Sequence, residues 1–157
     1  MEISFTKNSN KDHVLSCKRK DGSVTWRHII PFFISHDICH YSVETIVPLK
    51  NAFYGMVAGG TDISDFELPG EERNFELSEE AILAEHLVNL LTIELSQGKM
   101  ENFMEMFAGI YEERVGTNLY TLITETKLEK IRSAINSLMQ QWNSLEETKT
   151  MTLLFEE

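Results

Sequence analysis

The chain has 157 residues and a formal net charge of −11, with 42% hydrophobic and 25% charged residues. This length and composition predict a single globular domain over residues 1–157. The acidic charge and the lack of a clustered basic face argue against nucleic acid and anionic membrane surfaces as partners. The sequence also lacks the run of about 18 apolar residues that a membrane span needs, and its polar N-terminus has no signal-peptide core. We therefore expect a cytoplasmic protein.

Two runs of alternating residues near the N-terminus predict a β-hairpin. Residues 13–20 and 23–29 flank Asp21-Gly22, a strong two-residue turn signal. A shorter run over residues 3–6 predicts a third strand.

The pattern then becomes helical over residues 35–58. Ser35 is the expected N-cap of this first helix, and Asp37 suits the positive end of the helix dipole. We expect Asp37 to cap the helix rather than to bind a metal. Pro48 lies inside the segment and predicts a kink or a break there.

Three more helices are predicted, over residues 78–97, 100–114 and 119–145. Ser78 begins the first of them with a capping signature. The last has a regular amphipathic stripe, whose apolar positions are three and four residues apart. The stripe consists of Leu128, Ile131, Ile135, Leu138, Trp142 and Leu145.

Residues 148–156 return to a strand pattern, with Met151 and Phe155 among the alternating apolar positions. A strand at each end of the chain favours pairing within one sheet. The predicted fold class is therefore α+β: a small antiparallel sheet, made of the N-terminal hairpin and the C-terminal strand, packed against about four helices. We expect Trp26 on the face of the sheet that the helices cover.

Three side chains that can bind metals recur every four residues on the first predicted helix. His36, His40 and Glu44 fall within an arc of about 80° along one edge of its apolar side. Two histidines four residues apart on a helix are a recurrent chelate for transition metals. Glu44 would be a third ligand or the outer group that orients His40. The alternative is that all three are solvated surface residues.

The second predicted helix carries a carboxylate on its apolar side. Glu94 lies within the apolar stripe and His86 on its flank, whereas Glu85 falls on the opposite, wet side. A carboxylate taken from water needs a charged partner, a proton or a metal. We therefore expect the two helices to pack so that His86 and Glu94 complete the site begun by the first helix. The alternative is that Glu94 meets a basic side chain or a backbone amide, and that His86 is a core histidine.

The run His36-Asp37-Ile38-Cys39-His40 resembles the HExxH helix of zincin metalloproteases. In that family both histidines bind zinc and the glutamate is the general base. The resemblance implies that His36 and His40 are zinc ligands. Asp37 here replaces the family's glutamate.

The His36-Asp37 pair is also similar to the adjacent pair of HD-domain phosphohydrolases. That family uses an earlier helical histidine and a later aspartate as well. The earlier histidines of this chain, His13 and His28, lie in strand patterns.

These observations lead to the hypothesis of a metal-binding protein that could be a small metal-dependent hydrolase. The ligands would come from His36, His40, Glu44, His86 and Glu94, and the metal would be a divalent transition ion, with zinc first and iron, nickel or manganese as alternatives. Glu44 and Glu94 are the candidate catalytic carboxylates, which would take a proton from an activated water. The substrate, a small molecule or a protein, stays open.

The alternative hypothesis is a non-catalytic interaction module, in which the histidines and glutamates form a buried polar network. The stripe of the last helix, together with Met100, Phe103, Met104 and Met106, could hold a partner helix or mediate a homodimer. Bound metal would discriminate between the two hypotheses.

Overall fold

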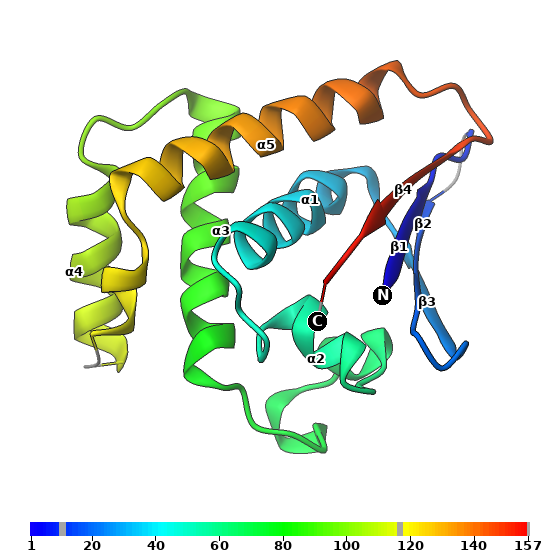
Figure 1. Ribbon diagram of the computed structural model, residues 1–157, viewed down its shortest axis with the longest axis horizontal. Helices are drawn as coiled ribbons and strands as arrows, with labels where there is room; N and C mark the ends of the chain where they lie inside the picture. The colour runs from blue at the N-terminus through cyan, green and yellow to red at the C-terminus, as the bar shows by residue number, and fades with distance from the viewer. Residues whose placement is uncertain (10–11, 116–117, 157) are drawn as a thin grey trace.

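The structure is a computed structural model that describes residues 1–9, 12–115 and 118–156. It contains one four-stranded antiparallel sheet in the order β3-β2-β1-β4, which confirms the predicted α+β class (Figure 1). The N-terminal hairpin and the C-terminal strand belong to this one sheet, as predicted. The strands are β1 (Glu2–Thr6), β2 (His13–Lys18), β3 (Val24–Ile29) and β4 (Thr150–Leu154).

The hairpin between β2 and β3 closes one residue earlier than the two-residue turn predicted. The backbone N–H of Arg19 donates to the carbonyl of Ser23 over 2.9 Å, and the N–H of Gly22 donates to the carbonyl of Arg19 over 3.0 Å. Gly22 has φ 88°, a left-handed conformation that glycine adopts without strain. The loop thus has three residues and ends in a left-handed glycine, which is the next most common type of hairpin loop.

The expected position of Trp26 is wrong, because its side chain lies on the uncovered face of the sheet and is 56% exposed. Alternation placed Trp26 and Thr25 on opposite faces correctly, but it is Thr25 that is buried. The covered face also receives Arg27, whose guanidinium binds Asp37 on the first helix. Burying this ion pair requires Trp26, one residue earlier, to point outward.

Five α-helices are present among the described residues, because the segment predicted as one helix over residues 35–58 is broken. The break follows from Pro48, since a proline disfavours helical backbone at the residue before it. The first helix begins at Pro31, a favoured first position, so Ser35 lies inside the helix and is not its N-cap. The helices are α1 (Pro31–Ile46), α2 (Phe53–Ala58), α3 (Glu79–Gln97), α4 (Phe103–Val115) and α5 (Glu125–Ser144).

Short 3-10 helices replace two stretches of the prediction. The segment between α2 and α3, for which no helix or strand was predicted, contains η1 (Ile63–Glu67) and η2 (Gly70–Glu72). Residues 119–122, predicted as the first turn of the last helix, form η3, and α5 starts after Thr124. The Thr124 hydroxyl caps α5 by accepting a hydrogen bond from the N–H of Lys127.

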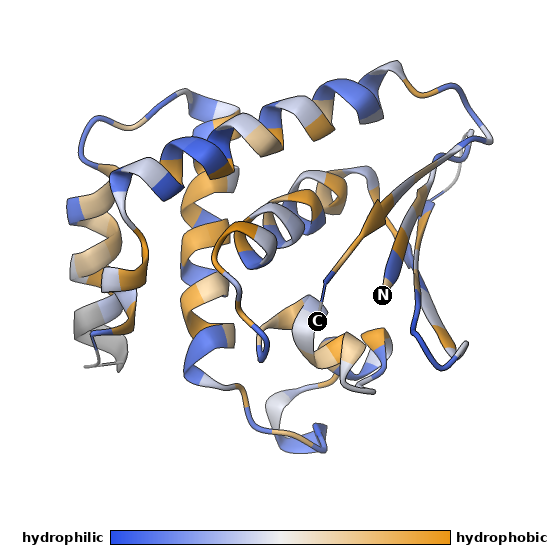
Figure 2. Ribbon diagram, in the orientation of Figure 1, coloured by the Kyte–Doolittle hydropathy of each residue, from blue (hydrophilic) through white to orange (hydrophobic). Residues whose placement is uncertain are grey.

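Helix α1 lies at the centre of the molecule, packed against α3 and α5 and lying beside the sheet, whereas α4 lies against α3 at the far side (Figure 1). Hydropathy follows this arrangement: α3 is apolar along most of its length, and α5 alternates between polar and apolar residues (Figure 2). The apolar side of α5 is buried from Leu128 to Trp142, as its stripe predicted. Among the described residues, no helix is long and apolar enough to cross a membrane.

Replacing Ile135 with alanine should lower the free energy of unfolding by about 2–4 kcal/mol, because the change leaves a cavity in the core. Ile135 is 2% exposed in the middle of the α5 stripe. Denaturant melts of the variant and the wild type measure the difference. The exposed Asn136→Ala on the same helix is the matched control and should change stability by less than about 1 kcal/mol. A loss below that value for Ile135→Ala would mean that the stripe is not part of the core.

Candidate metal centre

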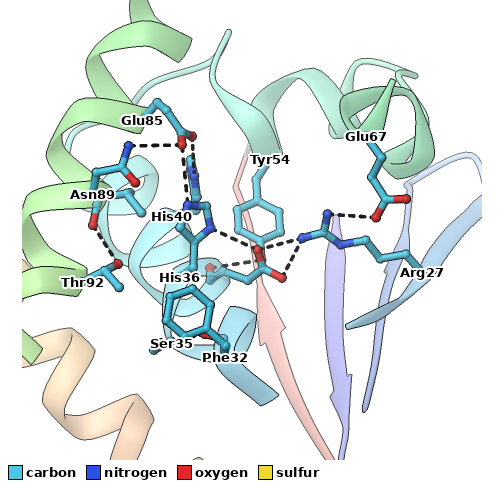
Figure 3. A network of polar contacts seen from close by, with 12 residues as sticks. Arg27, Phe32, Ser35, His36, His40, Tyr54, Glu67, Glu85, Asn89 and Thr92 are labelled. Carbon is cyan, nitrogen blue, oxygen red and sulfur yellow. Dashed lines mark hydrogen bonds and ion pairs between the residues drawn. The ribbon is translucent and has the colours of Figure 1, made fainter. Parts of the chain in front are cut away.

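Two histidines of α1 and one glutamate of α3 converge at the interface of these helices (Figure 3). The Nε2 atom of His40 lies 3.2 Å from Glu85 Oε2, and the Nε2 atom of His36 lies 3.6 Å from Glu85 Oε1. The two imidazole rings lie 4.8 Å apart between centroids, one helical turn from each other. One donor atom from each of the three residues falls within 4.8 Å of the others, so this group could hold a metal ion.

Glu44 holds His40 from the side away from Glu85. The Nδ1 atom of His40 lies 3.1 Å from Glu44 Oε1, and both side chains are buried. Glu44 Oε2 accepts hydrogen bonds from the backbone N–H groups of Tyr54 (2.8 Å) and Gly55 (3.2 Å) in the first turn of α2. A Cβ at position 55 would meet the carbonyl oxygen of Lys50 at 2.2 Å, so this close approach requires glycine. Glu44 therefore orients His40 and joins α1 to α2.

Asp37 lies beside the Nδ1 atom of His36, as Glu44 lies beside that of His40. Its carboxylate accepts from Arg27 Nη2 at both oxygens over 3.0 Å and is almost fully buried, so its expected role as a helix cap is wrong. The Nδ1 atom of His36 lies 3.6 Å from Asp37 Oδ1 and has no hydrogen-bond partner among the described residues. Each histidine thus has a carboxylate near Nδ1 and Glu85 near Nε2.

The carboxylates determine the charge of the two histidines. Burial by itself would lower the pKa of His40, but Glu44 and Glu85 outweigh it and raise the pKa to about 9. Burial and His40 oppose protonation of His36, yet Asp37 and Glu85 raise its pKa as well. The contacts with His36 and His40 lower the pKa of Glu85 well below its usual range. Without metal, the carboxylates therefore favour the protonated form of both histidines.

The pKa of Glu44 is raised, although a carboxylate beside a charged histidine is expected to have a lowered pKa. Burial raises it, while His40 and the N–H groups of Gly55 and Tyr54 lower it. We assign the proton of the pair to His40, because Glu44 Oε2 accepts two N–H groups and these favour the carboxylate. His40 in addition has Glu85 on its other side.

The three side chains line a pocket with a volume of about 360 Å³. Its apolar walls come from Phe33, Phe53, Phe66, Leu77 and Ala81. Its other charged lining residues are Arg27, Asp37 and Arg73. The candidate centre is therefore open to a small molecule through the pocket, although His40 itself is buried.

Glu94 and His86 do not join this group. The carboxylate of Glu94 accepts hydrogen bonds from Arg132 Nε (2.8 Å) and Nη2 (2.5 Å) on α5, and from the N–H of Met100 (2.8 Å). These are the basic side chain and the backbone amide of the alternative expectation. His86 is half-buried, and its ring lies 6.4 Å from that of Tyr111 on α4. The α1–α3 packing was predicted correctly, but α3 meets the histidines through Glu85.

Glu85 was not predicted as a site residue from the sequence, because it lies at the rim of the interface with half of its side chain exposed. A helical wheel cannot distinguish such a rim position from open solvent. In the structure Leu77, Ala81 and Glu85, four residues apart, all line the pocket.

Comparisons of the chain with models of protein families, with curated proteins and with solved structures find no match.

Proposed function

We propose that this protein binds a divalent transition metal through His36, His40 and Glu85 and acts as a small metal-dependent hydrolase. The observation that carries the proposal is the convergence of two histidine Nε2 atoms on one carboxylate at the wall of a pocket. Two histidines and a glutamate form a known donor set of catalytic zinc, which leaves a coordination position open. The same set also suits iron, so zinc is the first candidate and iron the second.

The spacing of the donor atoms supports this assignment. Ligands at zinc's usual bond lengths in a tetrahedral site lie about 3.3 Å from one another. The two Nε2–Glu85 distances are 3.2 and 3.6 Å, close to that value. Carboxylates beside both Nδ1 atoms match the outer groups that usually orient metal-binding histidines. The three donor atoms lie within 4.8 Å of one another, so an ion that replaced the histidine protons would have to draw them closer together.

When bound, such an ion would polarise a substrate oxygen or activate a water in the pocket. Glu44 would keep the Nε2 lone pair of His40 directed at the site by accepting the Nδ1 proton. Glu44 does not line the pocket and Glu94 is paired with Arg132, so neither is placed to act as a catalytic base as first expected. Of the described lining carboxylates, Asp37 is bound by Arg27 and lies beside His36 Nδ1, whereas Glu85 lies near the Nε2 atoms of both histidines.

A second candidate function is a metal-free polar network that holds α1, α2 and α3 together. The direct contact between His40 and Glu44 and the raised pKa of His40 favour it. An interaction module built on α5 has less support, because the apolar stripe of α5 and Phe103 are buried within the chain. Metal binding decides between the metal centre and the polar network.

The test is a zinc titration of protein purified without a histidine tag, followed by competition with a chromophoric chelator. We expect one zinc per chain, and we expect Glu85→Gln to weaken binding by more than the roughly 10–100-fold typical of outer groups. Glu79→Gln, an exposed glutamate on the same helix, is the matched control and should bind zinc like the wild type. The zinc-loaded protein should also hydrolyse 4-nitrophenyl acetate or 4-nitrophenyl phosphate faster than Glu85→Gln does. Equal zinc affinity for the wild type and Glu85→Gln would contradict the proposal.

A further inference from the structure

One pocket residue, Arg73, carries a positive charge that no acidic side chain balances among the described residues. Its Nε donates to the carbonyl of Leu68 and its Nη2 to the carbonyl of Phe66, both over 2.9 Å. These bonds fix the guanidinium in the pocket wall. Among the side chains that the structure describes, Nη1 has no hydrogen-bond acceptor.

The other arginines with described side chains contrast with Arg73. Arg19 pairs with Asp62, Arg27 with Asp37 and Arg132 with Glu94. In a chain with a net charge of −11, carboxylates are abundant, yet the recorded bonds of the Arg73 guanidinium go to backbone carbonyls. Arginine with free donors is well suited to recognising a carboxylate or a phosphate.

Five of the other lining residues are apolar, and three of these are aromatic. The rings of Phe53 and Phe66 lie 4.8 Å apart in an edge-to-face arrangement. Phe33 and Leu77 also line the pocket and are 42% and 43% exposed. Large apolar side chains left exposed around a concave site typically mark ligand binding.

We infer that the pocket takes a small organic anion, with its carboxylate or phosphate group on Arg73 and its apolar body between Phe33, Phe53 and Phe66. The inference rests on the proposed function for one part, because the metal at His36, His40 and Glu85 would face the same ligand. The contact with Arg73 is independent of the metal. It defines the substrate class of the proposed hydrolase as esters or related compounds that carry an acidic group.

The test measures the binding of three probes of similar size, benzoate, phenyl phosphate and the neutral benzyl alcohol, by amide chemical-shift titration. Zinc-loaded and metal-free protein are titrated separately. We expect at least one of the two anions to bind about tenfold or more tightly than benzyl alcohol, as one charge-assisted contact provides. The ratio between the affinities for benzoate and phenyl phosphate identifies the preferred acid group.

Two variants test the role of Arg73. Arg73→Gln should lose at least about tenfold in anion affinity, and Arg73→Lys should restore part of it, while the affinity for benzyl alcohol stays unchanged. Lys130→Gln removes the same charge from an exposed position on α5 and should leave anion binding unchanged. Equal affinities for anions and benzyl alcohol, or unchanged anion binding in Arg73→Gln, would overturn the inference.

The two proposals fail in different ways. If zinc binds but the anions show no preference, the inference is wrong and the metal centre stands. If zinc does not bind but metal-free protein holds benzoate or phenyl phosphate through Arg73, the anion pocket stands and the metal centre is wrong.

Discussion

Replacing His40 with alanine should abolish stoichiometric zinc binding and should also destabilise the metal-free protein. His40 supplies one of three donor atoms, and its loss should weaken zinc binding by more than the roughly 10–100-fold typical of an outer group. It also leaves Glu44 buried without its charged partner, a change that costs about 3–5 kcal/mol in other buried pairs. Chelator competition measures the first effect and denaturant melts in excess chelator measure the second.

Two glutamate variants make this prediction specific. Glu44→Gln keeps the zinc ligands but has one oxygen for His40 and the α2 amides to share, so zinc affinity should fall by about 10–100-fold. Glu94→Gln disturbs the contacts of Glu94 with Arg132 and with the N–H of Met100, and it should lower stability without changing zinc affinity. Equal zinc affinities in the wild type and His40→Ala would exclude His40 as a ligand.

Features of the fold that depend on local pattern could be predicted from the sequence. The hairpin, the C-terminal strand and the α5 stripe each follow from alternation or helical periodicity within one segment. The capping signature at Ser78 is confirmed as well, since its hydroxyl accepts a hydrogen bond from the N–H of Ala81.

Two features of the fold, the covered face of β3 and the start of α1, were assigned incorrectly. Periodicity shows that Trp26 and Thr25 face opposite ways, but the covered face is decided by the ion pair of Arg27 with Asp37. The start of α1 was misplaced because Ser35 is a frequent N-cap, whereas Pro31 is an equally good first residue that extends the helix by a turn.

In the candidate centre, the residues of α1 could be predicted from the sequence, whereas their partner on α3 could not. The four-residue spacing placed His36, His40 and Glu44 on one line, and the structure brings them together. The partner from α3 was taken to be Glu94, because a carboxylate on an apolar stripe needs compensation. Arg132 on α5 provides that compensation, and its sequence position, 38 residues away, gave no indication of the contact. Glu85 could not be chosen, since the crossing of α1 over α3 decides which rim position meets the histidines.

Protons and a metal ion compete for the same nitrogen atoms in this centre. Zinc needs the Nε2 lone pairs of His36 and His40, and in the metal-free protein both histidines have raised pKa values. Below about pH 6.5, the usual histidine value, two protons must leave for each zinc bound. Between the pKa of His36 and that of His40, about 9, one proton must leave.

The apparent zinc affinity should therefore fall by at least about 100-fold between pH 8 and pH 6, since each displaced proton contributes about tenfold per pH unit. Chelator competition at pH 6, 7 and 8 measures the zinc affinity.

The stability of the metal-free protein should change in the opposite direction and fall as the pH rises. The pKa of His40 is raised to about 9 on folding, so its protonation stabilises the protein fully below about pH 6.5, and this contribution is lost as pH rises through about 9. Melting temperatures in excess chelator should thus drop between pH 7 and pH 9.5, whereas one equivalent of zinc should offset the drop. His40→Ala is the control, and an equal drop in that variant would show that other groups cause it.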